Sequence, residues 1–95
     1  MSVVADFAEA DENGRRILRF TGSLVLGQAR KLGQKLDTVQ EQGFGVDLSA
    51  VGRMDTVGAW LIHKFIRDRG AQLVAASEEH RTLLQHVAKA DQPVT

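Results

Sequence analysis

The side chains that most often carry catalysis or bind metals are few in this 95-residue chain and are scattered along it. The three histidines, His63, His80 and His86, include no pair at the i, i+4 spacing that would place two imidazoles on one helical face. There is no cysteine, which excludes disulfides, zinc–thiolate sites and thiol nucleophiles. The sequence therefore predicts no metal site.

Nucleophilic and phosphate-binding motifs are also missing from the sequence. The nine glycines form neither GxGxxG nor GxxxxGK(S/T), the two patterns whose backbones cradle phosphates. None of the four serines occurs in the strand–turn–helix motif that presents a hydrolase nucleophile; they are Ser2, Ser23, Ser49 and Ser77. We therefore expect a non-enzymatic protein that needs no cofactor.

One segment does arrange polar side chains regularly, the helix predicted over residues 56–69. At about 100° per residue, its apolar side chains form one stripe, made of Gly58, Leu61, Ile62, Phe65 and Ile66 with Val57 at its edge. The opposite side carries Thr56, Trp60, His63, Lys64 and Arg67. A lone tryptophan among cationic side chains is typical of a protein interface. The alternative is that a neighbouring segment covers Trp60 as part of the core.

Asp55 and Thr56 stand at the start of this helix and allow two interpretations. Either side chain can cap the free backbone N–H groups of the first turn, which requires no function. Alternatively, the Thr56 hydroxyl accepts a phosphate, because a helix N-terminus tolerates negative charge. A phosphate beside Asp55 would alter a docking surface without unfolding the domain. The physics of the sequence leaves both interpretations open.

Alternating strands and helices must position these residues. Strands are expected at 3–8 and 15–20, joined as an antiparallel pair through the Asn13-Gly14 hairpin signal and ended by Gly22. A helix over 27–42, a strand over 44–48 and a loop over 49–55 precede the helix at 56–69, which ends at Gly70. A strand over 71–76 and a last helix follow. Ser77 caps that helix, and Glu78 and Glu79 lie in its first turn.

This order predicts one α/β domain over residues 1–90, with a mixed sheet of about four strands packed against about three helices. Residues 91–95 are expected to be a tail or the start of a linker. Twelve Lys and Arg balance twelve Asp and Glu without a basic block, so no nucleic-acid partner is expected. No signal peptide and no apolar run of about 20 residues occur, which predicts a cytoplasmic chain without direct membrane insertion.

Two neighbouring segments together resemble the signature of STAS domains. They are V-D-L-S-A-V at residues 46–51 and M-D-T-V-G-A-W-L at residues 54–61. Members of this family carry a strand similar to V-D-L-S, a short loop and then D-(S/T)-x-G opening a helix, and the expected order of elements agrees over nearly the whole chain. The resemblance implies a non-enzymatic binding module whose function falls on Asp55, Thr56 and Gly58. Thr56 matches the residue phosphorylated in anti-sigma factor antagonists, and a threonine in this place docks the ATPase subunit in Mla-type phospholipid transport.

Two departures from the antagonists favour the transporter branch. Val25 stands where the antagonists carry an acid after the second strand, and the sequence ends at Thr95, where they continue. We therefore expect the N-terminal domain of an Mla-type permease, docked on an ABC transporter ATPase at the cytoplasmic face of the inner membrane. The alternative is a free-standing antagonist, bound by an anti-sigma factor kinase and switched by phosphorylation at Thr56. A nucleotide-binding sensor is a third possibility, implied by the resemblance alone.

The predicted partner-binding residues combine both arguments. The resemblance assigns Asp55, Thr56 and Gly58, while the helical wheel assigns Trp60, His63 and Arg67. Thr56, Trp60, His63 and Arg67 are expected to face the partner, and Asp55 and Gly58 to shape the turn that presents them.

Overall fold

The computed structural model describes residues 6–12, 14–39 and 43–91. Their elements are, in chain order, β1 (Asp6–Glu12), β2 (Arg15–Leu24), α1 (Leu26–Leu36), β3 (Gly45–Met54), α2 (Thr56–Arg69), β4 (Gln72–Ala75) and α3 (Glu78–Ala90). This confirms the predicted α/β class, with a mixed four-stranded sheet and three helices in the described part of the chain.

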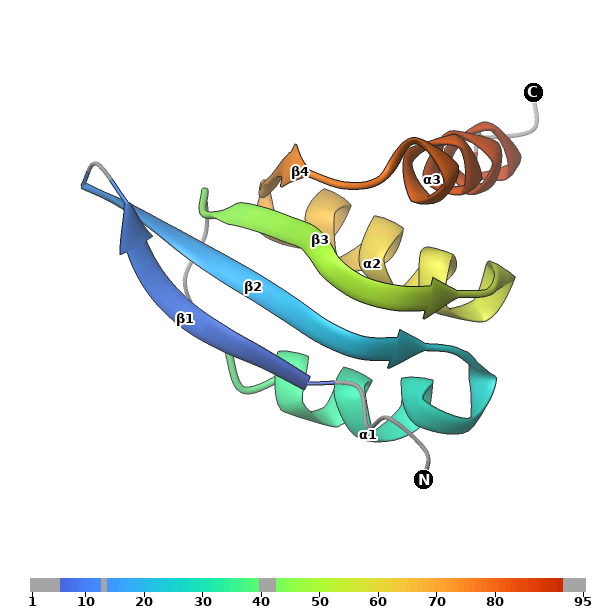
Figure 1. Cartoon of the computed structure of the whole chain (residues 1–95), viewed down its shortest axis with the longest axis horizontal. Helices are drawn as coiled ribbons and strands as arrows, with labels where there is room; N and C mark the ends of the chain where they lie inside the picture. Colours follow the sequence, from blue (N-terminus) through green and yellow to red (C-terminus); the bar gives the residue numbers. More distant parts are fainter. Residues whose placement is uncertain (1–5, 13, 40–42, 92–95) are drawn as a thin grey trace.

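The sheet has the strand order β1-β2-β3-β4 (Figure 1). β1 and β2 pair antiparallel, whereas β2 with β3 and β3 with β4 pair parallel. Parallel strands end at the same edge of a sheet, and the last paired residues of β2 and β3 are Leu24 and Met54. The helices that follow these strands, α1 and α2, therefore begin side by side at one end of the molecule.

The core lies between one face of this sheet and the helices. Alternate residues of the two central strands, Leu18, Phe20, Val46 and Leu48, are fully buried. Leu32 and Leu36 of α1 and Ala59, Ile62 and Phe65 of α2 complete the buried cluster from the helix side, and α3 adds Leu84 and Val87. The period of two along the strands and the three- to four-residue spacing in the helices are those of half-buried elements.

Several predicted boundaries are confirmed. α2 runs over residues 56–69 as expected and ends at Gly70, whose φ of 62° is the left-handed conformation that favours glycine. Ser77 caps α3 by accepting a hydrogen bond from the His80 N–H (3.2 Å), with Glu78 and Glu79 in the first turn. Gly14, with φ of 77°, lies in the turn between β1 and β2.

Other boundaries differ from the prediction. The prediction of a loop over 49–55 is wrong. β3 continues to Met54, because it stays paired with β2 across two register irregularities. β2 likewise extends past residue 20 to Leu24. Gly22 lies inside β2, and the pairing of β2 with the described residues of β1 reaches Thr21. α1 begins at Leu26 and ends at Leu36 instead of spanning 27–42.

The first strand extends further along the chain than expected. It was expected over 3–8 and spans Asp6–Glu12, so that its last residue pairs with Arg15 directly across the turn. The parts of these predictions that concern residues 1–5, 13, 40–42 and 92–95 lie outside the described residues, as does most of the predicted tail.

Candidate functional site

The first turns of α1 and α2 meet at the carboxylate of Asp55. Its Oδ1 accepts a hydrogen bond from the N–H of Gly58 (2.9 Å), which caps α2. Its Oδ2 accepts one from the N–H of Leu26 (2.9 Å), the first residue of α1. Val25, at the N-cap position of α1, makes no side-chain cap. One carboxylate therefore serves the N-termini of two helices.

The protonation state of Asp55 follows from these contacts. Partial burial acts to raise its pKa, but hydrogen bonds from the backbone N–H groups of Gly58, Leu26 and Val57 prevail and lower the pKa below its usual value of 3.8. Asp55 is therefore ionised at neutral pH, with both oxygens engaged. Of the two interpretations of the helix start, capping belongs to Asp55, and the Thr56 side chain is left free for another role.

Exposed side chains surround this capped turn. Thr56 is exposed as the first residue of α2, and its hydroxyl makes no hydrogen bond with the described residues. Leu26 is 68% exposed and Val57 is 40% exposed, and both donate backbone N–H groups to Asp55. Among the described residues, the only other large hydrophobic side chain that is exposed is Val74 of β4. We call Leu26, Thr56 and Val57 the helix-start patch.

Gly58 has a steric role beneath this patch. A Cβ atom on Gly58 would lie 1.9 Å from the carbonyl oxygen of Leu24, at the end of β2. Any side chain would therefore push the first turn of α2 away from the sheet. Gly58 is buried, in the turn that it was expected to shape.

Part of the predicted partner-facing side of α2 makes contacts within the chain, while Thr56, Lys64 and Arg67 are exposed. Trp60 is half-buried and packs against the core, with its ring in an edge-on contact with His63 (centroids 5.9 Å apart). His63 Nε2 lies 2.8 Å from a carboxylate oxygen of Asp91, at the end of α3, and Arg67 pairs with the same oxygen. These hydrogen bonds, from His63 first and then from Arg67, lower the pKa of Asp91. This part of the predicted surface therefore contacts α3.

The predicted apolar stripe of α2 is partly confirmed. Gly58, Ile62 and Phe65 are buried as expected, while Leu61 and Ile66 are half-buried. Ala59, which the stripe omitted, is completely buried. A helical wheel assumes one buried side, whereas α2 packs against the sheet, α1 and α3, so its buried arc is wider and includes part of the side that carries Trp60.

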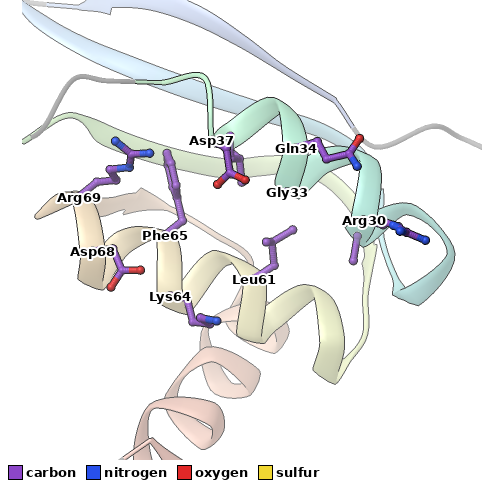
Figure 2. Close-up of a pocket in the computed structure, with 11 residues that line it drawn as sticks. Arg30, Gly33, Gln34, Asp37, Leu61, Lys64, Phe65, Asp68 and Arg69 are labelled. Carbon is purple, nitrogen blue, oxygen red and sulfur yellow. The ribbon is translucent and has the colours of Figure 1, made fainter.

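A groove of about 540 Å³ separates the exposed sides of α1 and α2 (Figure 2). Leu61 and Phe65 project into it from α2, and Leu61 approaches α1 where that helix carries Gly33. Its rim holds charges of both signs, with the cations Arg30, Lys64 and Arg69 and the acids Asp37 and Asp68. The rim charges alone therefore select neither an anionic nor a cationic ligand.

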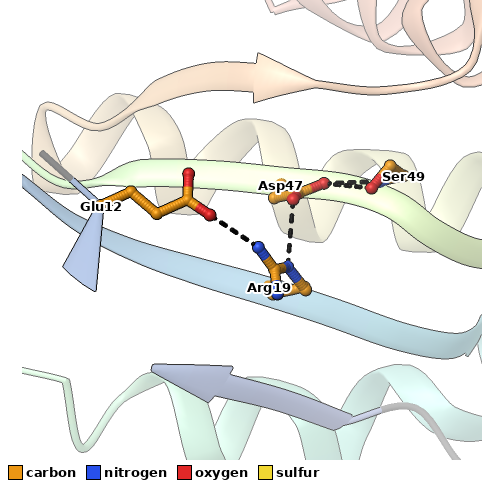
Figure 3. Close-up of polar contacts among 4 residues, drawn as sticks. All are labelled: Glu12, Arg19, Asp47 and Ser49. Atoms are coloured by element: carbon orange, nitrogen blue, oxygen red, sulfur yellow. Dashed lines mark hydrogen bonds and ion pairs between the residues drawn. The ribbon is translucent and has the colours of Figure 1, made fainter. Parts of the chain in front are cut away.

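A polar cluster joins three strands of the sheet (Figure 3). The Arg19 guanidinium lies 3.2 Å from Asp47 on β3 and 2.9 Å from Glu12 on β1. Asp47 also accepts hydrogen bonds from the N–H and hydroxyl of Ser49 (2.8 and 2.6 Å). Burial acts to raise the pKa of Asp47, but the bonds from Ser49 and Arg19 lower it. Because every partner is internal, this cluster ties β1, β2 and β3 together.

The remaining polar groups of the described residues form no second site. No three or more potential metal ligands come together in the described ranges 6–12, 14–39 and 43–91. His80 is buried, and its Nδ1 lacks a hydrogen-bond partner there. Over the same ranges, no helix has the length and apolar character needed to cross a bilayer.

Comparison with known proteins adds no relative to this picture. No family model matches the sequence, and no curated protein matches it significantly. The helix-start patch and the motif at residues 46–61 are therefore the observations from which function is inferred. Leu26 was not among the residues that the sequence singled out, since nothing in the sequence indicates that its N–H bonds to Asp55.

Proposed function

We propose that this chain is a non-enzymatic STAS-type docking module that binds the ATPase subunit of an Mla-type phospholipid ABC transporter through the helix-start patch. The observation that carries this proposal is the exposure of Leu26 and Val57 beside Thr56. Leu26 and Val57 both adjoin Asp55, and their exposed side chains offer apolar area that a protein partner can cover. Burying them against a partner would gain roughly 25 cal/mol for each Å² removed from water.

The D-T-x-G motif supports the same location. Asp55 is engaged by the N–H groups of two helices, and Gly58 is needed for close approach to Leu24. Both therefore have structural roles that would be required whatever the partner. Thr56 alone among the three motif residues is exposed and lacks a side-chain contact in the described structure. The motif position that the resemblance connects with docking is thus the one available to a partner.

The exposed hydroxyl of Thr56 also favours the second candidate, an anti-sigma factor antagonist switched by phosphorylation. A phosphate on Thr56 would sit at the positive end of α2, where the helix dipole stabilises it. It would also place up to two negative charges beside the aliphatic side chains of the patch, and so oppose docking.

Calorimetric titration of a purified phospholipid-transporter ATPase subunit tests the proposal. Leu26→Ser should weaken binding by about tenfold or more, as expected for a central contact residue. Thr56→Glu should also weaken it, whereas Thr56→Ser should bind normally. Val74→Ser is the matched control, since it removes the exposed aliphatic side chain of β4. Normal binding by Leu26→Ser, or equal loss with Val74→Ser, would contradict docking at this patch.

Incubation with an anti-sigma factor kinase and labelled ATP tests the second candidate. If the native chain becomes labelled and Thr56→Ala does not, the result supports an anti-sigma factor antagonist. The Thr56→Ser variant should still accept label, because it keeps a hydroxyl at the same position.

A further inference from the structure

We infer that the partner covers the helix-start patch with a protein surface that surrounds its apolar contact with acidic side chains. This inference rests on the proposed function, because it describes the chemistry of the partner at that same patch. The distribution of charge around Leu26, Thr56 and Val57 is the observation behind it.

Acidic side chains are missing from the segments that build this end of the molecule. The chain has no net charge, yet residues 13–36 contain no Asp or Glu at all. Residues 48–67 contain one, Asp55, whose two oxygens already accept hydrogen bonds from the helix N-termini. Free negative charge is therefore absent from both segments.

Three exposed cations border the patch on the same elements. Arg30 lies one turn after Leu26 on the same side of α1, and Lys64 lies two turns after Val57 on α2. These two side chains also stand on the rim of the groove between the helices, which carries Asp37 and Asp68 as well (Figure 2). Arg53 is exposed at the end of β3, two residues before Asp55. None of the three pairs with an acid in the described part of the chain.

Three other cations of β2 and α1 lie close to acidic side chains. Arg19 pairs with Glu12 and Asp47, Arg16 lies within 3.7 Å of Glu9 and Asp11, and Lys35 pairs with Asp6. Arg30, Arg53 and Lys64 thus stay without an acidic partner among the described residues, on the elements that carry the helix-start patch.

A protein surface fits this arrangement better than an anionic membrane. Surfaces that recognise anionic lipids usually gather about four to eight cations, more than the three found here. A small apolar centre with a charged rim is the arrangement typical of protein interfaces. Complementary charge at the rim raises the association rate and selects the partner.

The experiment uses two variants of the full chain that carry the photo-crosslinking amino acid p-benzoyl-phenylalanine. It replaces Leu26 in the test variant and Val74 in the control variant. The protein captured in cells at position 26 alone is purified and titrated with the unlabelled chain. Arg53→Glu and Lys64→Glu should each weaken its binding by about fivefold at about 0.05 M salt, and by much less at about 0.5 M salt. Arg81→Glu, which makes the same charge change on an exposed residue of α3, should bind like the native chain.

The outcomes separate the two proposals. If a protein is captured at position 26 but both charge-reversal variants bind it like the native chain at low salt, the inference of an acidic partner is overturned. The proposal of docking at the patch then stands. Absence of any adduct specific to position 26 would overturn docking itself. A third outcome is that no protein adduct forms, while the native chain binds phosphatidylglycerol vesicles and Lys64→Glu does not. This outcome would mean that the patch binds a membrane and not a protein.

Discussion

The carboxylate of Asp55 accepts a hydrogen bond from the backbone N–H of Leu26, a residue 29 positions earlier in the chain. The same carboxylate caps α2 through Gly58. Because both helix starts share one anion, Asp55 fixes the position of Leu26 relative to Thr56 and Val57. The exposed patch is therefore held in place by a residue that is itself half-buried.

Removal of Asp55 should cost more stability than the loss of an ordinary cap. Asp55→Ala frees the N–H groups of two helices and should lower the free energy of unfolding by about 2–3 kcal/mol, against about 1 kcal/mol for Ser77→Ala, which uncaps α3 alone. Asp55→Asn keeps one acceptor oxygen and should fall between them. Urea unfolding of the three variants measures this. Equal losses for Asp55→Ala and Ser77→Ala would mean that the bond to Leu26 contributes nothing.

Asp55 should also contribute to acid unfolding. Its pKa is lowered in the folded chain, so its contribution to stability is complete above the unfolded value of about 3.8 and is lost as pH falls through the lower folded pKa. The free energy of unfolding should therefore fall less between about pH 5 and about pH 2 in Asp55→Asn than in the native chain. Ser77→Ala, whose cap is uncharged, should keep the full pH dependence. Identical slopes in all three proteins would contradict this assignment.

Gly58 and Gly33 offer a paired test of why glycine occurs in each helix. Gly58→Ala places a methyl group 1.9 Å from the Leu24 carbonyl oxygen and should lower the free energy of unfolding by about 3 kcal/mol or more. Gly33→Ala meets only Leu61 Cδ1, at 3.4 Å, and should raise it by up to about 1 kcal/mol through helix propensity. Thermal and urea unfolding measure both. A tolerated Gly58→Ala would show that α2 can move from β2 without cost.

The parts of the fold that the sequence predicts correctly are those with local signals. Asp55 and Gly70 mark both ends of α2, and Ser77 marks the start of α3. The second half of β3 has no such signal, because Ser49 and Gly52 are typical of a loop. Pairing with β2 holds this half in the sheet, and that interaction joins segments about 30 residues apart.

The same distinction applies to the candidate site. Asp55 and Thr56 can be identified from their place at a helix start, since capping depends on adjacent residues. The role of Leu26 depends on a contact with Asp55 that brings together distant segments. The contacts of His63 and Arg67 depend on where α3 ends, because Asp91 binds both. No periodicity within α2 carries that information.

Trp60 provides the test of which side of α2 meets a partner. Its ring packs against the core and His63, so Trp60→Ala should lower the free energy of unfolding by about 2 kcal/mol, less than for a completely buried aromatic residue. Trp60→Phe should recover part of this loss, and both variants should bind the ATPase subunit normally at a temperature where they are folded. Leu26→Ser should show the reverse, with native-like thermal stability and weak binding. Weak binding by folded Trp60→Ala, with its stability unchanged, would return the interface to the side of α2 that carries His63 and Arg67.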